Sequence, residues 1–354
     1  MTNPTDIAPR TVQRLLIRSS NWIGDAVMTT PAVRAVREIF RDAHITILVK
    51  PLFAPVFEHS PRVDRVMLYD DRIRHRGLAG KLRLAADLRK DHFDAALLFP
   101  NSFEAAFITA AARIPVRMGY RTDGRGLLLT HAVGNPGRFK QGHHVDYYLG
   151  LLRGLGFETE NRGLELYTGD REKEEARQIL SASGLAGRPL LGISPGATFG
   201  PAKQWFPERY AALIDRLCAA RPWAVMILGG PGDRETAEKI ARSARTPVIN
   251  LCGRTTVGQA MALVEQCGLF VTNDSGLMHV AASFDIPLVA IFGSTSAVAT
   301  GPLGRRSRVV QVKMACNPCL KPECPEGHLK CMEQVTVEMV ADAAASLLAG
   351  ESGP

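Results

Sequence analysis

The corner between residues 268 and 283 carries polar residues of the kind that bind a phosphate. An apolar run at 269–271 is typical of a parallel strand that is buried on both faces, and a helical pattern resumes at Leu277. Between them, N–H groups at the helix start and the positive end of the helix dipole attract an anion. We predict an anion site made by Asp274, Ser275, Gly276 and His279. The alternative is that Asp274 and Ser275 only cap the helix and His279 only packs.

Two other loops in the second half also follow apolar strands. Gly196–Lys203 comes after the run 190–193, and Gly229–Asp233 comes after the run 224–228. Three such loops at one edge of a parallel sheet suit a nucleotide diphosphate. Lys203 is the candidate cation for the leaving diphosphate, although a solvated lysine is the alternative. The other residues of these loops that are candidates for binding the nucleotide are Thr198, Gly230 and Asp233.

In the first half, the polar loop SSNWIGD at residues 19–25 follows the apolar run 15–17. Asp25 is its only carboxylate, and the dipole at a helix start favours the ionised form. A carboxylate in that place can accept a proton from a sugar hydroxyl, so Asp25 is a candidate general base. N-capping is the alternative, and the sequence pattern by itself favours it.

The elements that position these loops alternate between strand and helix patterns along both halves. This rhythm predicts an α/β fold with two doubly wound parallel sheets, in domains 1–169 and 170–354. Ligands of such folds bind beyond the carboxyl ends of the strands, so we expect the active site in a cleft between the domains. A helix is predicted over residues 26–40. A final helix at 336–348 is expected to hold the C-terminus against the folded chain, with the first domain as a candidate surface. Residues 121–142 show no period and are predicted to be a functional or mobile loop.

Composition and charge narrow the classes of function. With 354 residues, 46% of them hydrophobic and 22% charged, the chain is typical of a soluble globular protein. It has no apolar run long enough to cross a bilayer and no secretory signal, so we expect a cytoplasmic location. Residues 1–165 carry 24 Lys and Arg against 17 Asp and Glu, whereas the remainder carries 19 against 18. The basic first half suggests an anionic partner, and a solubilising surface is the alternative.

Several motifs of nucleotide enzymes are missing from the sequence. There is no G-x-G-x-x-G after the first strand of either half and no G-x-x-x-x-G-K-[ST], which argues against dinucleotide oxidoreductases and P-loop NTPases. There is also no D-x-D, which weakens the case for a glycosyltransferase that depends on a divalent metal. We therefore expect no required cofactor and no catalytic metal.

Three blocks of sequence closely resemble the ADP-heptose:lipopolysaccharide heptosyltransferase family. They are RSSNWIGDAVMTTPAVRAVRE, SPGATFGPAKQWFPERYAALI and TNDSGLMHVAASFDIPLVAIFGSTS, and the resemblance spans nearly the whole chain. A further block, PNSFEAAFITAAARIPVRMGYRTDGRGLLL, looks most like the branch that adds the second heptose. The resemblance implies a GT-B fold and an inverting transfer of L-glycero-D-manno-heptose from ADP-heptose to heptosyl-Kdo2-lipid A, in lipopolysaccharide inner-core biosynthesis.

The resemblance also implies roles for individual residues. By motif position, Asp25 corresponds to the family's proposed base and Lys203 to its phosphate-contacting lysine. The segment Asp274–His279 corresponds to the family's donor loop. Asp233 is aligned more loosely with a residue that faces the donor's adenosine. The acceptor that the resemblance implies is an anionic glycolipid, which accounts for the basic first half. Such an acceptor implies peripheral contact with the cytoplasmic face of the inner membrane. No nucleic acid partner is expected. The acceptor-side candidates are Asn21, Trp22, Asn101, Arg121 and Arg125, with Arg138 and Lys140 in the same irregular loop.

Four cysteines fall outside this scheme. Cys316, Cys319, Cys324 and Cys331 have the spacing C-x2-C-x4-C-x6-C, which is compact enough for a structural zinc site in a reducing compartment. Reduced thiols and adventitious disulfides are the alternatives.

Other functions remain open at this stage. A first-heptose transferase acting on Kdo2-lipid A is one alternative, and a nucleotide-sugar epimerase, which can share the GT-B fold, is another. A noncatalytic membrane-surface protein would explain the basic half but not three anion loops in the other half.

Overall fold

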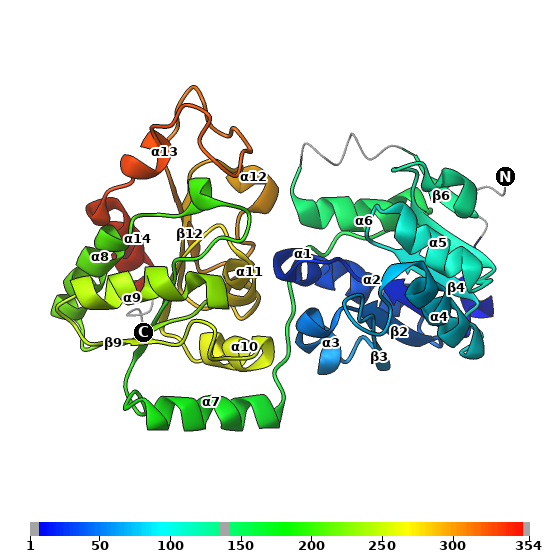
Figure 1. The fold of residues 1–354 in the computed structure, drawn as a ribbon, viewed down its shortest axis with the longest axis horizontal. Coiled ribbons are helices and arrows are strands. Elements are labelled where there is room, and N and C mark those ends of the chain that lie inside the picture. The colour runs from blue at the N-terminus through cyan, green and yellow to red at the C-terminus, as the bar shows by residue number, and fades with distance from the viewer. Residues whose placement is uncertain (1–6, 135–141, 350–354) are drawn as a thin grey trace. The chain divides into compact units, whose positions relative to one another are not determined.

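The computed structural model describes residues 7–134 and 142–349. The chain divides into two compact units, Met1–Tyr167 and Thr168–Pro354, and each is described by itself (Figure 1). Within the described residues, no helix has both the length and the apolar character needed to span a membrane.

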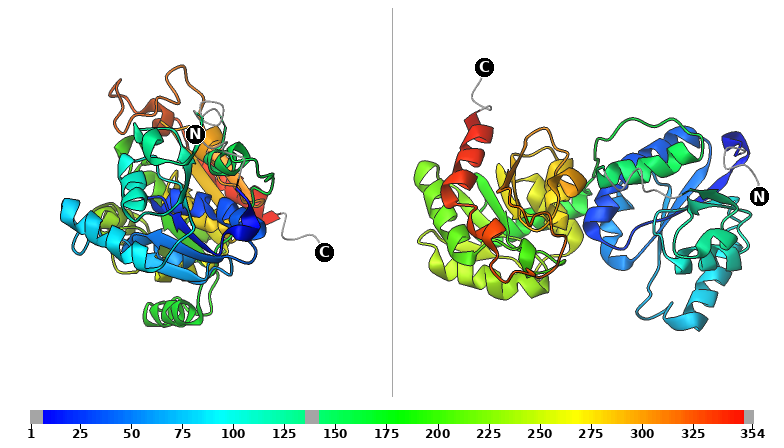
Figure 2. Two further views of the ribbon diagram at one scale, coloured as in Figure 1. Left: turned by 90° about the vertical axis from the view of Figure 1, so that its right-hand side faces the viewer. Right: turned by 90° about the horizontal axis from the view of Figure 1, so that it is seen from above.

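Unit 1 is built on a six-stranded parallel sheet with the order β3-β2-β1-β4-β5-β6. The strands are β1 (Arg14–Arg18), β2 (His44–Val49), β3 (Arg65–Leu68), β4 (Ala95–Leu98), β5 (Val116–Tyr120) and β6 (His131–Val133). The helices are α1 (Ile23–Met28), α2 (Thr30–Ile39), α3 (Pro55–Glu58), α4 (Gly77–Lys90), α5 (Phe103–Ala111) and α6 (His144–Gly154). Helix α6 packs with α1 and α2, whereas α4 packs with α5 on the other face of the sheet (Figures 1 and 2).

Unit 2 repeats this plan, with the strand order β12-β11-β10-β7-β8-β9. Its strands are β7 (Leu190–Ser194), β8 (Ala224–Ile227), β9 (Val248–Asn250), β10 (Leu269–Asn273), β11 (Leu288–Phe292) and β12 (Ser307–Gln311). Its helices are α7 (Asp170–Ala182), α8 (Pro207–Ala220), α9 (Arg234–Ser243), α10 (Val257–Glu265), α11 (Gly276–Ser283), α12 (Ala297–Thr300), α13 (Lys330–Glu333) and α14 (Val337–Ala349). Helix α8 packs with α9 and α14, and α10 packs with α7 and α11.

The two sheets place the candidate loops at equivalent points. The central strands β7 and β10 are buried along their whole length, as expected for parallel strands covered on both faces. In unit 1 the chain reverses its direction of travel across the sheet between β1 and β4, and in unit 2 it does so between β7 and β10. At such a switch point, the loops leaving the two strands diverge and open a crevice that accepts ligands. The predicted pair of doubly wound parallel sheets is therefore confirmed.

The helix predicted over residues 26–40 is two helices, because Pro31 interrupts it. Proline has no N–H, so it cannot bond to the carbonyl of Val27 four residues earlier. The hydroxyl of Thr30 donates to that carbonyl at 2.8 Å instead, and the hydroxyl of Thr29 donates to Ala26 O at 2.7 Å. The first of the two helices, α1, carries Asp25 in its first turn.

One other expectation about secondary structure differs from the structure. The segment 121–142, predicted to be a loop, contains the short helix η3 (Arg125–Leu128) and the strand β6, while residues 135–141 lie outside the described part. Strand β6 has only three residues, which are too few to show a strand pattern in the sequence.

Helix α14 buries its apolar face against α8, β11 and β12 of its own unit. Its packing onto the first domain stays a prediction.

Candidate active site

Lys203 and Asp274 form a nearly buried ion pair at the carboxyl edge of the unit 2 sheet. Lys203 Nζ lies 2.6 Å from Asp274 Oδ2, and the side chains are 13% and 4% exposed. Asp274 Oδ2 also accepts hydrogen bonds from Thr295 Oγ1 at 2.7 Å and from Thr300 Oγ1 at 3.3 Å. Lys203 follows β7 and Asp274 follows β10, so the pair sits at the switch point of this sheet. Three donors on one oxygen hold the carboxylate, which in turn holds the ammonium group in place.

Helix α11 begins without the side-chain cap that was the alternative to an anion site. Its N-cap residue is Ser275, which makes no cap hydrogen bond; Ser275 Oγ lies 3.0 Å from Thr272 Oγ1 instead. Gly276 is the first residue of the helix. The N–H groups of the first turn are therefore not satisfied by Asp274 or Ser275, and they remain suited to an anion. His279 lies further along α11 and is buried.

Asp233 joins the loops that follow β7 and β8. It ends the short helix η6 (Pro231–Asp233), and its Oδ2 accepts the N–H of Gly230 at 2.8 Å. A Cβ at position 196 would lie 2.3 Å from the Asp233 carboxyl group, so a side chain there would have to displace this carboxyl group. Burial raises the pKa of Asp233 above its usual range. The carboxyl group thus lies in the angle between two strand-end loops, where a ribose hydroxyl is commonly bound in doubly wound folds.

The loop that carries Lys203 has an exposed outer part. Thr198 is exposed and Phe199 is 48% exposed. Lys203 Nζ lies 4.9 Å from the centroid of the Phe199 ring, a cation–π distance. Lys203 itself ends the short helix η5 (Pro201–Lys203).

Asn273 is a buried residue that connects the two central loops of unit 2. Its Nδ2 donates to Pro195 O at 2.6 Å, and its Oδ1 accepts from Trp205 N at 3.2 Å and from Tyr210 Oη at 2.9 Å. The bond to Pro195 ties β10 to the β7 loop, and the other two reach the segment just after Lys203. These contacts could not be predicted from the sequence, because the partners of Asn273 lie 63 to 78 residues away in the chain.

Replacing Asn273 with Ala is expected to lower the free energy of unfolding by at least about 3 kcal/mol, because three buried polar groups lose their partner at roughly 1–3 kcal/mol each. Chemical denaturation measures this. Asn250→Ala is the control. Asn250 makes two hydrogen bonds that are less buried than those of Asn273, so this substitution should lower the free energy of unfolding by only about 1 kcal/mol. Equal losses for the two variants would show that Asn273 is not a connector.

In unit 1, the Asp25 carboxylate meets the start of α6. Asp25 Oδ1 accepts a hydrogen bond from Tyr148 Oη at 3.3 Å and lies 3.8 Å from His144 Nδ1. Burial raises the pKa of Tyr148 well above its usual range, and the neighbouring Asp25 carboxylate adds to this shift, so the tyrosine stays protonated as a donor. The N-cap residue of α1 is Trp22, and Asp25 lies in the first turn with its side chain 27% exposed. The carboxylate is thus oriented by α6 and is accessible to a ligand.

Asn21 and Trp22 lie beside Asp25 in the same loop. Asn21 Oδ1 accepts from Arg18 Nη2 at 2.8 Å, and Trp22 is 59% exposed. Burial lowers the pKa of the Arg18 guanidinium to about 10. The guanidinium also lies 4.9 Å from the centroid of the Tyr69 ring. The buried guanidinium of Arg18 therefore holds this loop in place, while the side chain of Trp22 faces solvent.

Asn101 follows β4 and is held by Tyr147 and Arg125. Its Oδ1 accepts from Tyr147 Oη at 2.7 Å and lies 3.5 Å from Arg125 Nη2. Arg125 is completely buried, and its guanidinium also donates to Tyr120 O at 2.9 Å and to Pro100 O. Burial lowers the pKa of Arg125 to about 10.

Arg125 was predicted to contact the acceptor, but its guanidinium is completely buried and bonds to protein groups instead. All of its donors face the protein, because the β4 loop leaves buried carbonyls that need them. Arg121 is exposed, as expected for a contact residue, whereas Arg138 and Lys140 lie outside the described residues.

Sequence reasoning did not find His144, Tyr147 and Tyr148. The tyrosines of α6 reach two loops, since Tyr148 bonds to Asp25 and Tyr147 bonds to Asn101. The run HHVDYY at residues 143–148 was the available signal. Its partners lie 123 and 46 residues away, so only the folded sheet shows them together.

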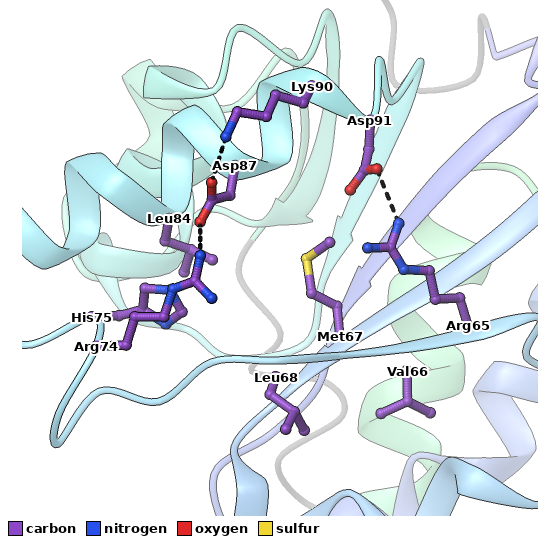
Figure 3. Close-up of a pocket in the computed structure, with 10 residues that line it drawn as sticks. All are labelled: Arg65, Val66, Met67, Leu68, Arg74, His75, Leu84, Asp87, Lys90 and Asp91. Atoms are coloured by element: carbon purple, nitrogen blue, oxygen red, sulfur yellow. Dashed lines mark hydrogen bonds and ion pairs between the residues drawn. The ribbon is translucent and has the colours of Figure 1, made fainter.

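A groove of about 410 Å³ lies at the β3 edge of unit 1, away from these loops. Figure 3 shows Arg74 and Lys90 directed at Asp87, at 2.8 and 2.9 Å, and Arg65 directed at Asp91, at 2.9 Å. Each of these cations is already paired with a carboxylate in the groove, and none of the predicted site residues lines it.

Solved structures of similar proteins have the same architecture. The chain is similar to the E. coli ADP-heptose lipopolysaccharide heptosyltransferase II, with a TM-score of 0.83 and 28% identity over 96% of this chain and 100% of that one. It is also similar to a family 9 glycosyl transferase from Veillonella parvula, with a TM-score of 0.86 and 25% identity over 96% and 98%. The predicted GT-B type is confirmed by the match to the first of these.

Sequence comparison gives the family. The chain is 31% identical to lipopolysaccharide heptosyltransferase 2 of Salmonella typhimurium over 352 residues, which are 96% of this chain and 99% of that protein. The profile of glycosyltransferase family 9 (heptosyltransferase) matches residues 81–330. The resemblance found in the sequence is confirmed, and the protein is a glycosyltransferase. The chain belongs to glycosyltransferase family 9, the heptosyltransferase family.

Proposed function

We propose that this protein transfers L-glycero-D-manno-heptose from ADP-heptose to heptosyl-Kdo2-lipid A, with inversion at the anomeric carbon. The observation that carries this proposal is the near full-length similarity to a protein named lipopolysaccharide heptosyltransferase 2. The site residues support it, because each unit supplies one part of the chemistry that an inverting transfer needs.

Unit 2 supplies the charge stabilisation for the leaving ADP. Lys203, held by Asp274, places its ammonium group for a phosphate oxygen, and the first N–H groups of α11 offer further donors. Asp233 accepts a hydrogen bond from the adenosine ribose. Because these donors are already oriented by the fold, little reorganisation is needed as charge develops on the diphosphate.

Unit 1 supplies the base. The acceptor hydroxyl transfers its proton to Asp25 as it attacks the anomeric carbon, and the bond from that carbon to the ADP oxygen breaks. Tyr148 and His144 orient the carboxylate. Asn21, Trp22, Asn101 and Arg121 bind the acceptor, and Arg125 positions Asn101. The reaction needs no cofactor.

The test is ADP release from ADP-heptose with three additions: heptosyl-Kdo2-lipid A, Kdo2-lipid A, or no acceptor. We expect release with heptosyl-Kdo2-lipid A only. Equal release with Kdo2-lipid A would assign the first-heptose reaction instead. Conversion of the donor without any acceptor would identify an epimerase.

The two arginines of the irregular segment should respond differently to replacement with Ala. Arg121→Ala should raise the acceptor KM several-fold and leave the melting temperature unchanged, because the side chain is exposed. Arg125→Ala should lower the free energy of unfolding by about 2–4 kcal/mol, because buried carbonyls lose their donors. Steady-state kinetics and thermal unfolding separate the two effects. Similar behaviour of the two variants would contradict this division of roles.

We also propose that unit 1 contacts the membrane that holds the acceptor. Ile73, Leu78 and Leu82 are 83%, 64% and 47% exposed, and Leu78 and Leu82 are four residues apart on one face of α4. Exposed arginines lie in the same segment, namely Arg72, Arg76 and Arg83. Apolar side chains among basic ones fit an anionic lipid surface, where each cation contributes about 1 kcal/mol.

The contact predicts binding to phosphatidylglycerol vesicles, and weaker binding to phosphatidylcholine vesicles, in a sedimentation assay. Replacing both Ile73 and Leu78 with Ser should reduce the bound fraction at least about fivefold, since apolar area leaves the interface. Leu127→Ser is the control, because Leu127 is 91% exposed in the same unit but lies outside this surface. An equal loss in the control, or none in the double variant, would reject this surface.

A further inference from the structure

The four cysteines left out of the proposed reaction are gathered around one small cavity. Cys316, Cys319 and Cys324 lie on the segment between β12 and α13, and Cys331 is in the first turn of α13. All four line a cavity of about 20 Å³, and all four are free thiols. Cys331 is buried, whereas the other three are partly or fully exposed. The cavity is close in size to one small ion or one water molecule.

The chain makes a tight turn directly after Cys324. The N–H of Gly327 donates to Cys324 O at 3.1 Å, and Gly327 provides the positive φ of 68° that this turn requires. The turn brings His328 back towards Cys324, whose Sγ is 4.0 Å from His328 Nδ1.

His328 lies close to the thiols, but its Nδ1 atom already accepts a backbone hydrogen bond. His328 Nδ1 accepts the N–H of Lys330 at 3.0 Å and is 4.0 Å from Cys324 Sγ. An imidazole that accepts at Nδ1 carries its proton on Nε2 when neutral, so neither nitrogen offers a free lone pair. The ligand set is therefore the four cysteines.

The cysteine segment also supports the loops of the ion pair. Ala202 N donates to Pro322 O at 3.0 Å, and a Cβ at Gly200 would lie 2.4 Å from that same oxygen. On the other side, Leu320 N donates to Ser294 O at 2.8 Å, next to Thr295, which bonds to Asp274. The segment thus contacts the loop of Lys203 and the loop that holds its carboxylate partner.

We propose that Cys316, Cys319, Cys324 and Cys331 bind one metal ion as a tetrahedral thiolate centre, and that this centre stiffens the support behind Lys203. Zinc and iron are the ions that four thiolates select in this geometry. In the described structure, no three of the sulfur atoms lie within 4.8 Å of one another, so binding draws them inward by rotation about χ1. Each thiol that coordinates releases its proton to solvent.

The first experiment is elemental analysis of the full-length protein purified under reducing conditions. We expect about one zinc or iron ion per chain, and the element found distinguishes the two. Cys319→Ser and Cys324→Ser should each lower the metal content at least about tenfold. Cys218→Ser is the matched control, because Cys218 is a half-buried free thiol on α8 and outside the cluster.

Cobalt titration of the metal-stripped wild-type protein provides a second measurement that does not depend on the variants folding. Visible absorption of a tetrahedral Co²⁺–thiolate complex supports the site, and ADP affinity should recover several-fold as cobalt binds. Less than a tenth of an ion per chain together with no cobalt absorption, or disulfides among these cysteines in the freshly purified protein, would overturn the proposal. Metal content does not depend on heptose transfer, so this result stands apart from the test of the proposed function.

Discussion

Replacing Asp25 with Asn is expected to lower kcat by about 10²- to 10⁴-fold, the usual cost of losing a general base. Asparagine keeps the size of the side chain, and its carbonyl oxygen can still accept from Tyr148, but it cannot take the acceptor's proton. The carboxylate is accessible and makes one 3.3 Å hydrogen bond to Tyr148, so little stability is lost with its charge. Single-turnover kinetics with saturating donor and acceptor measures the effect on the chemical step.

ADP affinity and melting temperature are the controls for Asp25→Asn, and both should stay close to those of the native protein. Tyr148→Phe is the matched variant, because it removes the orienting hydrogen bond and leaves the base. We expect it to lose roughly tenfold in kcat. If Asp25→Asn melts early but turns over normally when folded, Asp25 is a structural residue and the base lies elsewhere.

Replacing Lys203 with Gln is expected to lower kcat by about 10²- to 10³-fold, the usual cost of removing one group that stabilises charge in the transition state. The amide N–H₂ group can still donate to Asp274, so the buried carboxylate keeps a partner, while the positive charge beside the leaving diphosphate is lost. Lys203→Arg keeps the charge with different geometry and should lose less activity. Steady-state kinetics with varied donor concentration, together with calorimetric ADP binding, measures both parts of the effect.

The control for charge is Lys239→Gln. Lys239 is exposed on α9 and pairs with Glu235 at 2.8 Å, so its loss changes the net charge of unit 2 equally without touching the site. This variant should be as active as the native protein. A Lys203→Gln protein that is strongly destabilised, yet has normal kcat when folded, would mean that the ion pair with Asp274 serves the fold only.

The residues that determine local conformation were readable from the sequence. Apolar runs such as Leu269–Val271 and the helical pattern after Leu277 depend on neighbours within a few positions, so strand, corner and helix follow from residue type and spacing. Lys203 and Asp274 could be proposed because each follows a strand, and parallel strands end at the same edge. For the same reason, the two doubly wound sheets were predicted from the alternation of patterns.

The partners of the site residues were decided by the tertiary structure. The order of strands places β4 beside β1 and β10 beside β7, and no local pattern specifies that order. It brings Asp25 to Tyr148 and Asn273 to Pro195, across 123 and 78 residues. The burial of Arg125 was likewise not predictable from the sequence, because an arginine in a Gly- and Arg-rich segment is expected at the surface. Only the packed β4 loop, with carbonyls that need a donor away from water, explains why the side chain is completely buried.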